Sequence, residues 1–415
     1  MEFLKGACLV GQSGGPTAVI NASICGAVET ARKHPAITRV FGAINGIEGV
    51  LNDALFDFAH EDEREIALLP NTPSAALGSC RYKLKDSGAD DTDYRRILEV
   101  FQKHDIRYFF YNGGNDSMDT CNKISKYMQS AGYTCRIIGI PKTIDNDLAA
   151  TDHCPGYGSA AKYIATSVCE VSLDSKAYTK GSVIIFEIMG RNAGWLAAAA
   201  ALAGVTGEGP DLVYLPERPF DIDSFVEDVR EIFERKNSCI VAVSEGVRDA
   251  DGRFISEYGS TLANSKDAFG HSQMGGLAST LVRFVKEATG YKTRGIELSL
   301  LQRCAAHSAS KTDVVEAYMA GAAAVANAVA GASDKMVAFE RAPGEKYVCN
   351  AVLMPLSDVA NAEKTVPDKW INEKGNGMTQ AFIDYALPLI EGEPDRVYEN
   401  GLPRFARLKK TPVRE

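Results

Sequence analysis

The chain has 415 residues, of which 45% are hydrophobic and 24% are charged, and its formal net charge is −9 at pH 7. This is an ordinary globular composition, and the length suffices for roughly two or three packed units whose core needs neither disulfides nor a structural metal. The acidic balance, with no lysine- and arginine-rich block to offset it, argues against nucleic acid or an anionic membrane as a partner.

The N-terminus and the cysteines indicate where in the cell the protein is located. Residues 1–10 lack a basic stretch followed by a long apolar run, and the most apolar run, 193–204, is too short to span a bilayer. Ten cysteines lie between Cys8 and Cys349 without a C-x-x-C pair. We therefore expect small buried thiols rather than disulfides or zinc ligands, in a soluble cytoplasmic protein.

Apolar runs alternate with helix-like stretches along the chain. The expected strands are residues 7–10, 108–111, 136–140, 182–189 and 239–244. The expected helices are residues 17–32, 118–129, 159–173, 225–235, 277–289 and the alanine-rich 317–332. Strands that are apolar on both faces are typical of a parallel sheet covered by helices, so the pattern predicts an α/β fold of the doubly wound type. Two similar lobes would fit this order, and beyond about residue 334 the signal weakens.

Each predicted strand ends in an unusual polar sequence. These sequences are GQSGG at 11–15, NGGND at 112–116, PKTIDND at 141–147, MGR at 189–191 and SEG at 244–246. In open α/β sheets, ligands bind at the carboxyl ends of the strands. We therefore expect the five ends to contribute to one site.

The two glycine-rich loops are candidates for phosphate and metal binding. The loop at 11–15 lies between a strand and a helix, where backbone amides can face an anion, although a tight turn alone would have the same sequence. In the second loop, Asn115 and Asp116 offer oxygen ligands suited to Mg²⁺. The following Ser117 is equally suited to capping a helix.

The segment 141–147 carries the strongest signal, because one lysine, one threonine and two aspartates follow directly after a strand. A lysine can neutralise a transferring phosphoryl group, and a carboxylate can accept a hydroxyl proton. The alternative is a solvated turn. Arg191 and Glu245, at the next strand ends, offer an anion clamp and a hydroxyl acceptor, whereas either alone would suit a surface ion pair.

These motifs, in their order over roughly residues 6–310, resemble those of the phosphofructokinase family. The resemblance rests on PKTIDND, GGNDS, MGR, SEG and LQR, the last at 301–303. It implies two Rossmann-like lobes with the active site in the cleft between them. The donor-binding lobe would comprise 1–140, completed by about 304–345, and the sugar-phosphate lobe 141–303. We expect residues 346–415 to be a C-terminal extension that packs over the lobes or modifies an interface, without chemistry of its own.

The resemblance also implies residue roles, with Asp145 as the base that takes the proton from the sugar 1-hydroxyl. The implied catalytic residues are Asp145, Lys142, Asp116 and Thr143. The implied sugar-phosphate contacts are Thr143, Ile144, Asp145, Met189, Gly190, Arg191, Glu245, Arg294, Leu300, Leu301, Gln302 and Arg303. The implied pyrophosphate contacts are Gly14, Gly15, Arg81 and Lys142. Mg²⁺ would be held by Asn115 and Asp147, although the family usually has Asp at position 115.

Two residues bear on the choice of phosphoryl donor. ATP-using members of the family typically carry glycine where Asp116 and Lys142 stand here, and pyrophosphate-using members typically carry Asp and Lys. Asp116 would repel the α-phosphate of a nucleotide, and Lys142 would add positive charge for pyrophosphate. The resemblance therefore implies reversible, Mg²⁺-dependent phosphoryl transfer from pyrophosphate to fructose 6-phosphate, by a homodimer or homotetramer.

Other functions remain open at this stage. An ATP-dependent phosphofructokinase or a sedoheptulose 7-phosphate kinase would have the same fold. A non-catalytic regulatory subunit is a different class, and we would expect it to have lost the aspartate or the lysine of PKTIDND. A related lipid or dinucleotide kinase would fit the glycine-rich loop alone, but it would not account for MGR or LQR.

Overall fold

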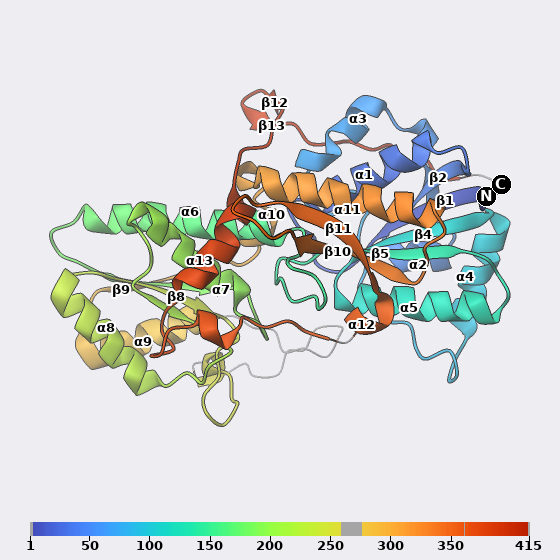
Figure 1. Ribbon diagram of the computed structural model, residues 1–415. Helices are drawn as coiled ribbons and strands as arrows, with labels where there is room; N and C mark the ends of the chain where they lie inside the picture. The colour runs from blue at the N-terminus through green and yellow to red at the C-terminus, as the bar shows by residue number, and fades with distance from the viewer. Residues whose placement is uncertain (1–2, 259–275, 361, 414–415) are drawn as a thin grey trace.

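The apolar runs form two separate sheets, each in its own lobe, in the computed structural model, which describes residues 3–258, 276–360 and 362–413 (Figure 1). The larger sheet has the order β11-β10-β5-β4-β1-β2-β3. It consists of β1 (Gly6–Gln12), β2 (Ile37–Ala43), β3 (Leu55–Asp57), β4 (Ile106–Gly113), β5 (Arg136–Pro141), β10 (Lys335–Arg341) and β11 (Cys349–Pro355). The smaller sheet has the order β7 (Leu212–Tyr214), β8 (Cys239–Ser244), β6 (Val183–Ile188) and β9 (Thr293–Glu297).

Both sheets are mainly parallel. The smaller sheet is parallel throughout, and in the larger sheet only the two outermost strands, β3 and β11, run antiparallel to their neighbours. Every residue of β1, β6 and β8 is buried. This burial explains the near-continuous apolar sequence of these strands, because helices cover both faces of each sheet.

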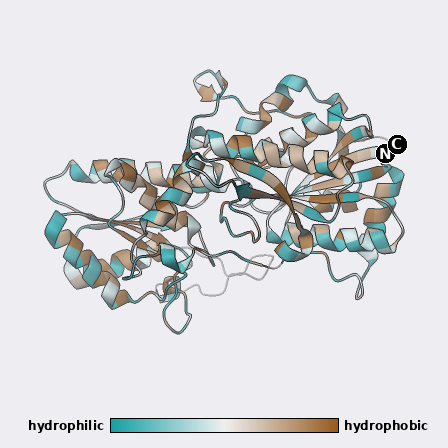
Figure 2. Cartoon of the chain, in the orientation of Figure 1, coloured by the Kyte–Doolittle hydropathy of each residue, from teal (hydrophilic) through white to brown (hydrophobic). Residues whose placement is uncertain are grey.

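Helices cover each sheet on two faces, with hydrophobic strands inside and hydrophilic outer helix surfaces (Figure 2). On the larger sheet, one face carries α1 (Ile20–Lys33) and α11 (Lys311–Val329), and the other carries α2 (Gly46–Leu51), α4 (Thr92–Lys103), α5 (Asn115–Ser130) and α12 (Leu356–Val359). On the smaller sheet, one face carries α6 (Tyr157–Lys176), α7 (Trp195–Ala199) and α13 (Gln380–Ala386), and the other carries α8 (Ile222–Lys236) and α9 (Leu277–Thr289). The short α3 (Glu63–Ala67) and α10 (Leu301–Cys304) lie in connections.

Helices α1 and α11 pack closely because each has a glycine at the contact. A Cβ built at Gly321 would lie 1.9 Å from the carbonyl oxygen of Ser23, and one at Gly26 would lie 2.1 Å from that of Tyr318. Any larger residue at either position would push the helices apart, so these glycines set the distance between α1 and α11.

The predicted α/β fold with two doubly wound lobes is confirmed. All five predicted strands and all six predicted helices are present, with ends shifted by at most six residues. The sequence did not predict β2, β3, β7, β9, β10 or β11. Strands β3 and β7 have three residues each, and the edge strand β9 is largely exposed, so these three lack a long apolar run. Strands β2 and β10 have seven residues each and lie inside the larger sheet.

The expected extension 346–415 packs over both lobes, but it does not begin at residue 346 as a separate unit. The boundary at 346 falls inside the β10–β11 hairpin, and β11 forms an edge of the larger sheet. The chain then crosses to the smaller lobe, where α13 packs, and returns to the larger lobe. There Pro412 pairs with Phe56, and Val413 N donates to Leu55 O at 2.9 Å. The C-terminal segment therefore contacts both lobes.

All ten cysteines are free, six of them buried, and Cys304 is exposed. Within the described residues, no helix combines the length and the apolar character needed to cross a membrane.

Candidate active site

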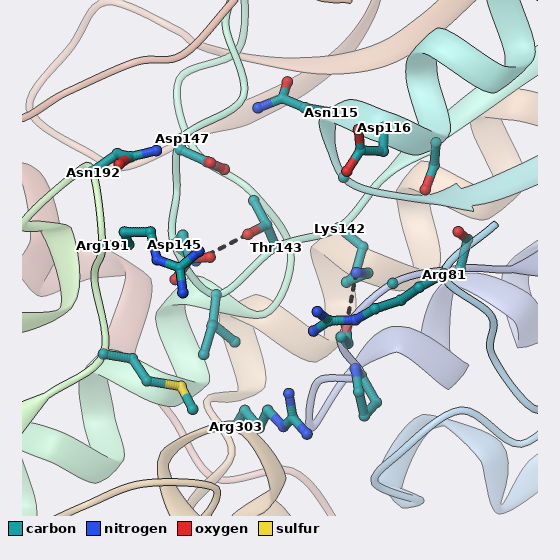
Figure 3. A pocket seen from close by; sticks show the side chains of 18 of the residues that line it. Arg81, Asn115, Asp116, Lys142, Thr143, Asp145, Asp147, Arg191, Asn192 and Arg303 are labelled. Atoms are coloured by element: carbon teal, nitrogen blue, oxygen red, sulfur yellow. Dashed lines mark hydrogen bonds between the residues drawn. The ribbon is translucent and has the colours of Figure 1, made fainter. Parts of the chain in front are cut away.

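The five polar strand ends converge on one cavity of about 420 Å³ between the two lobes (Figure 3). The ends of β1, β4 and β5 approach it from the larger lobe, and those of β6 and β8 from the smaller one. The sequence-predicted residues that line it are Gly14, Gly15, Arg81, Asn115, Asp116, Lys142, Thr143, Ile144, Asp145, Asp147, Met189, Arg191, Glu245 and Arg303. The expected convergence of the five ends is confirmed.

The position of the cavity follows from the topology of the larger sheet. The chain leaves β1 for β2 on one side, and it later enters β4 on the other side. At such a switch point the connections diverge, which leaves a crevice at the carboxyl ends of the strands. The glycine-rich loops after β1 and β4 both lie at this crevice.

The loop after β1 brings bare backbone close to two cationic side chains. Gly14 has φ +75°, in the left-handed region that favours glycine. A Cβ built on Gly14 would lie 3.3 Å from Lys142 Nζ, and one on Gly15 would lie 3.3 Å from Arg303 Nη1. Ser79 Oγ donates to Gly14 O at 2.6 Å and holds the turn. Glycine backbone and two cationic side chains thus lie together at the cavity, an arrangement suited to an anion.

Lys142 is buried directly after β5. Its Nζ donates to Gly15 O at 2.7 Å, and its backbone N donates to Gly113 O at 3.0 Å. Burial lowers the pKa of Lys142 to about 8, against the opposing effect of the charges of Asp145 and Asp147. The residue therefore joins the loops of β1, β4 and β5, with its ammonium at the cavity wall.

Two aspartates project into the cavity from the turn after Lys142. Burial raises the pKa of Asp145, and the charge of Glu245 raises it further. Burial also raises the pKa of Asp147, and the charges of Asp145 and Glu363 add to the effect. In the sequence, Asp145 and Asp147 are separated by one asparagine.

That asparagine, Asn146, shapes the turn, although the sequence suggested no role for it. It is fully buried and has φ +54°, which asparagine tolerates better than most residues. Its Nδ2 donates to Tyr385 Oη at 2.9 Å, and its Oδ1 accepts from Cys154 N at 2.9 Å. These contacts fix the turn while both neighbouring carboxylates line the cavity.

The smaller lobe supplies the opposite wall. Glu245 Oε1 accepts from Gly190 N at 3.4 Å, and Ser244 Oγ donates to Gly190 O at 2.5 Å. Burial raises the pKa of Glu245. Gln302 Oε1 accepts from Met189 N at 3.2 Å. Gly190 and Gln302 therefore support the wall without lining the cavity.

Three further predicted contacts lie away from this cavity. Arg294 is exposed on the edge strand β9, and Leu300 and Leu301 are 55% and 59% exposed. Within the described residues of one chain, none of the three side chains lines the cavity.

The residues expected to hold a metal fit that role chemically. Asn115 Oδ1 is buried at the cavity and has no hydrogen-bond partner among the described residues. Asp147 contributes a carboxylate to the same cavity, and hard cations such as Mg²⁺ prefer oxygen ligands of these two kinds.

Eight lining residues were not among the predicted site residues. They are Ser13, Pro16, Cys80, Tyr82, Gly114, Ser117, Asn192 and Glu363. The first seven lie within or beside a sequence motif or beside the predicted Arg81. Glu363 adjoins neither, since it belongs to a segment in which the sequence pattern is weak.

Comparison with known proteins agrees with this geometry. The family model described as phosphofructokinase matches residues 7–328. The chain is 49% identical to pyrophosphate–fructose 6-phosphate 1-phosphotransferase of Halomonas elongata, over 96% of this chain and 95% of that protein. Crystal structures of pyrophosphate-dependent phosphofructokinases are also similar. That from Nitrosospira multiformis has a TM-score of 0.90 and 43% identity, covering 99% of this chain and 98% of the other. That from Marinobacter aquaeolei has a TM-score of 0.89 and 44% identity, with the same coverage.

Proposed function

The chain belongs to the phosphofructokinase family, and we propose that it transfers a phosphoryl group reversibly from pyrophosphate to the 1-hydroxyl of fructose 6-phosphate. The products are fructose 1,6-bisphosphate and phosphate. The observation that carries the proposal is the position of Lys142. Its buried ammonium lies against the glycine-rich loop after β1, and Asp145, three residues later, lines the same cavity. A phosphoryl group and the attacking hydroxyl would thereby be held between a cation and a base.

In the proposed mechanism, Asp145 accepts the proton of the 1-hydroxyl as the sugar oxygen attacks one phosphorus of pyrophosphate. The bond from that phosphorus to the bridging oxygen breaks, and phosphate leaves with the bonding electron pair. Lys142, beside Gly14, and Arg303, beside Gly15, neutralise charge on the phosphates. On the opposite wall, Glu245 and Arg191 would bind the sugar and the transferring group.

We further propose that Mg²⁺ is the cofactor and that Asn115 and Asp147 hold it. Bound there, Mg²⁺ would neutralise phosphate charge. The phosphoryl donor would bind to the larger lobe, formed by residues 1–140 and about 304–345. The sugar phosphate would bind to residues 141–303.

The proposal is tested by measuring fructose 1,6-bisphosphate formation with Mg²⁺ and fructose 6-phosphate, using pyrophosphate in one series and ATP in another. We expect turnover with pyrophosphate and little with ATP. Turnover with ATP alone would refute the choice of donor. No turnover with either donor would point to another sugar phosphate or to a non-catalytic subunit.

Replacing Asp116 by Gly should shift the donor preference of the enzyme from pyrophosphate toward ATP. Asp116 is exposed in the first turn of α5 and lines the cavity. Like charges about 4 Å apart repel by roughly 1–4 kcal/mol near a protein surface. Removing this carboxylate should therefore raise the ratio of ATP-dependent to pyrophosphate-dependent kcat/KM roughly 10-fold or more. An unchanged ratio would contradict the assignment of Asp116 as the residue that excludes nucleotide.

The pH profile of kcat/KM should be bell-shaped. Asp145 acts deprotonated and its pKa is raised, so the rate should fall as pH drops through a value above the ordinary aspartate pKa of about 3.9. Lys142 acts protonated and its pKa is lowered to about 8, so the rate should fall as pH rises through about 8. Lys142→Arg should move the basic limb to higher pH. A wild-type profile with no basic limb below about pH 10 would refute the role given to Lys142.

We propose that the protein acts in the cytoplasm, where its free thiols would remain reduced, as a homodimer or homotetramer. Leu300 and Leu301, both exposed, suit a surface covered by a second copy. Light scattering on the purified chain measures the assembly size, and a monomer at assay concentration would refute this proposal.

A further inference from the structure

Glu363 brings a carboxylate to the cavity from a segment far from every motif. It lines the same cavity as Asn115 and Asp147. Its backbone pairs with Leu148 in an antiparallel bridge, and the next residue, Lys364, donates its N–H to Asp147 O at 2.7 Å. The C-terminal segment therefore runs directly beside the turn that carries Asp147.

Contacts on both sides hold this segment in place. Lys364 Nζ donates to the carbonyl oxygens of Thr151 at 3.0 Å and Asp152 at 2.8 Å. Trp195, on the smaller lobe, donates its Nε1 proton to Lys364 O at 2.8 Å. Val366 N donates to Glu217 Oε1 at 2.9 Å. The backbone that follows Glu363 is thus held by several hydrogen bonds.

The Glu363 carboxylate itself retains acceptor capacity. Its hydrogen bonds within the described chain come from one donor, Asn192 Nδ2, which lies 3.3 Å from each carboxylate oxygen. A carboxylate offers about four acceptor positions, so most of them remain for a ligand or for water. In the view of Figure 3, Asp147 lies between Asn192 and Asn115 along one side of the cavity.

The two residues expected to hold Mg²⁺ carry only one negative charge between them. Asn115 Oδ1 is buried and unpartnered among the described residues, but an amide oxygen is neutral. Asp147 is then the one anionic ligand of the pair. Affinity for hard divalent cations rises with the number of charged oxygen ligands. A second carboxylate beside Asp147 would supply the charge that position 115 lacks.

We infer that Glu363 completes the divalent-cation site, so that the C-terminal segment contributes directly to metal binding. This inference rests on the Mg²⁺ dependence in the proposed function. It assigns Asn115, Asp147 and Glu363 to one site, in which Glu363 binds the ion directly or through a coordinated water.

The test measures metal binding without turnover. Mn²⁺ is titrated into the purified full-length protein, alone and with imidodiphosphate, and free Mn²⁺ is followed by electron paramagnetic resonance. Glu363→Gln should weaken Mn²⁺ binding about 10-fold or more, a loss typical for residues that support a metal site. Asn115→Asp in the Glu363→Gln background should restore most of the affinity. Glu373→Gln is the matched control, because Glu373 is exposed in the same segment and does not line the cavity.

The outcomes separate this inference from the proposed function. Wild-type protein that binds Mn²⁺, with Glu363→Gln binding equally tightly, would overturn the role of Glu363 and leave the function intact. Wild-type protein that binds no Mn²⁺ even with imidodiphosphate would overturn both the Mg²⁺ dependence and this inference. A change only in KM for fructose 6-phosphate would show that Glu363 positions Asn192 instead, and would overturn the metal assignment.

Discussion

Replacing Asp145 by Asn is expected to lower kcat by about 10²–10⁴-fold, the range typical of a positioned general base. The asparagine has the same size but cannot take the hydroxyl proton. The backbone N of residue 145 would still donate to Thr143 Oγ1, a contact of 3.0 Å, so the turn should keep its shape. Because proton transfer occurs in the transition state, kcat and kcat/KM should fall together while KM for fructose 6-phosphate changes little.

The measurement is steady-state kinetics with Mg²⁺ and pyrophosphate in both reaction directions. Asp223→Asn is the matched control, since Asp223 is exposed in the first turn of α8 and distant from the cavity in sequence and structure. An Asp145→Asn enzyme with near-normal kcat would exclude Asp145 as the base.

Replacing Lys142 by Met is expected to lower kcat with pyrophosphate by about 10²–10³-fold, the typical cost of removing one charge-stabilising group from a preorganised site. Methionine has a similar length and suits a buried position, but it carries no charge. The loss of kcat should exceed the loss caused by removing a surface lysine. Lys142 is buried beside the glycine-rich loop, where solvent screening of its charge is weak.

Two controls accompany this variant. Lys346→Met removes a lysine that is exposed and away from the cavity, and it should leave kcat unchanged. In Lys142→Met, any residual activity should also lose the basic limb of the pH profile near pH 8, because the group responsible for it is absent. A residual profile that retains this limb would assign it to another group.

Much of the site could be predicted from local sequence. A strand buried on both faces needs a continuous apolar run, and a parallel sheet places all its carboxyl ends at one edge. The polar ends such as 141–147 were therefore recognisable in the sequence, and the structure brings all five to one cavity. The edge strand β9 escaped prediction because solvent covers much of it and no apolar run is required there.

Other features depend on contacts between residues distant in the chain. Asn146 is held by Tyr385, which lies 239 residues further along. Glu363 reaches the cavity because its backbone pairs with Leu148. Neither residue belongs to a local pattern, since the partner that gives each its position is far away in sequence.

The sequence by itself therefore determined the fold class, the five loops and the candidate phosphoryl-transfer residues, because apolar periodicity and loop composition are local properties. The tertiary structure alone decided that the C-terminal segment supplies part of the cavity wall through Glu363. It also decided that Arg294, Leu300 and Leu301 are exposed and do not line the cavity of their own chain. Both of these features depend on which segments, far apart in sequence, pack together. The packing is determined by the summed burial and hydrogen bonding of the whole chain rather than by any one segment.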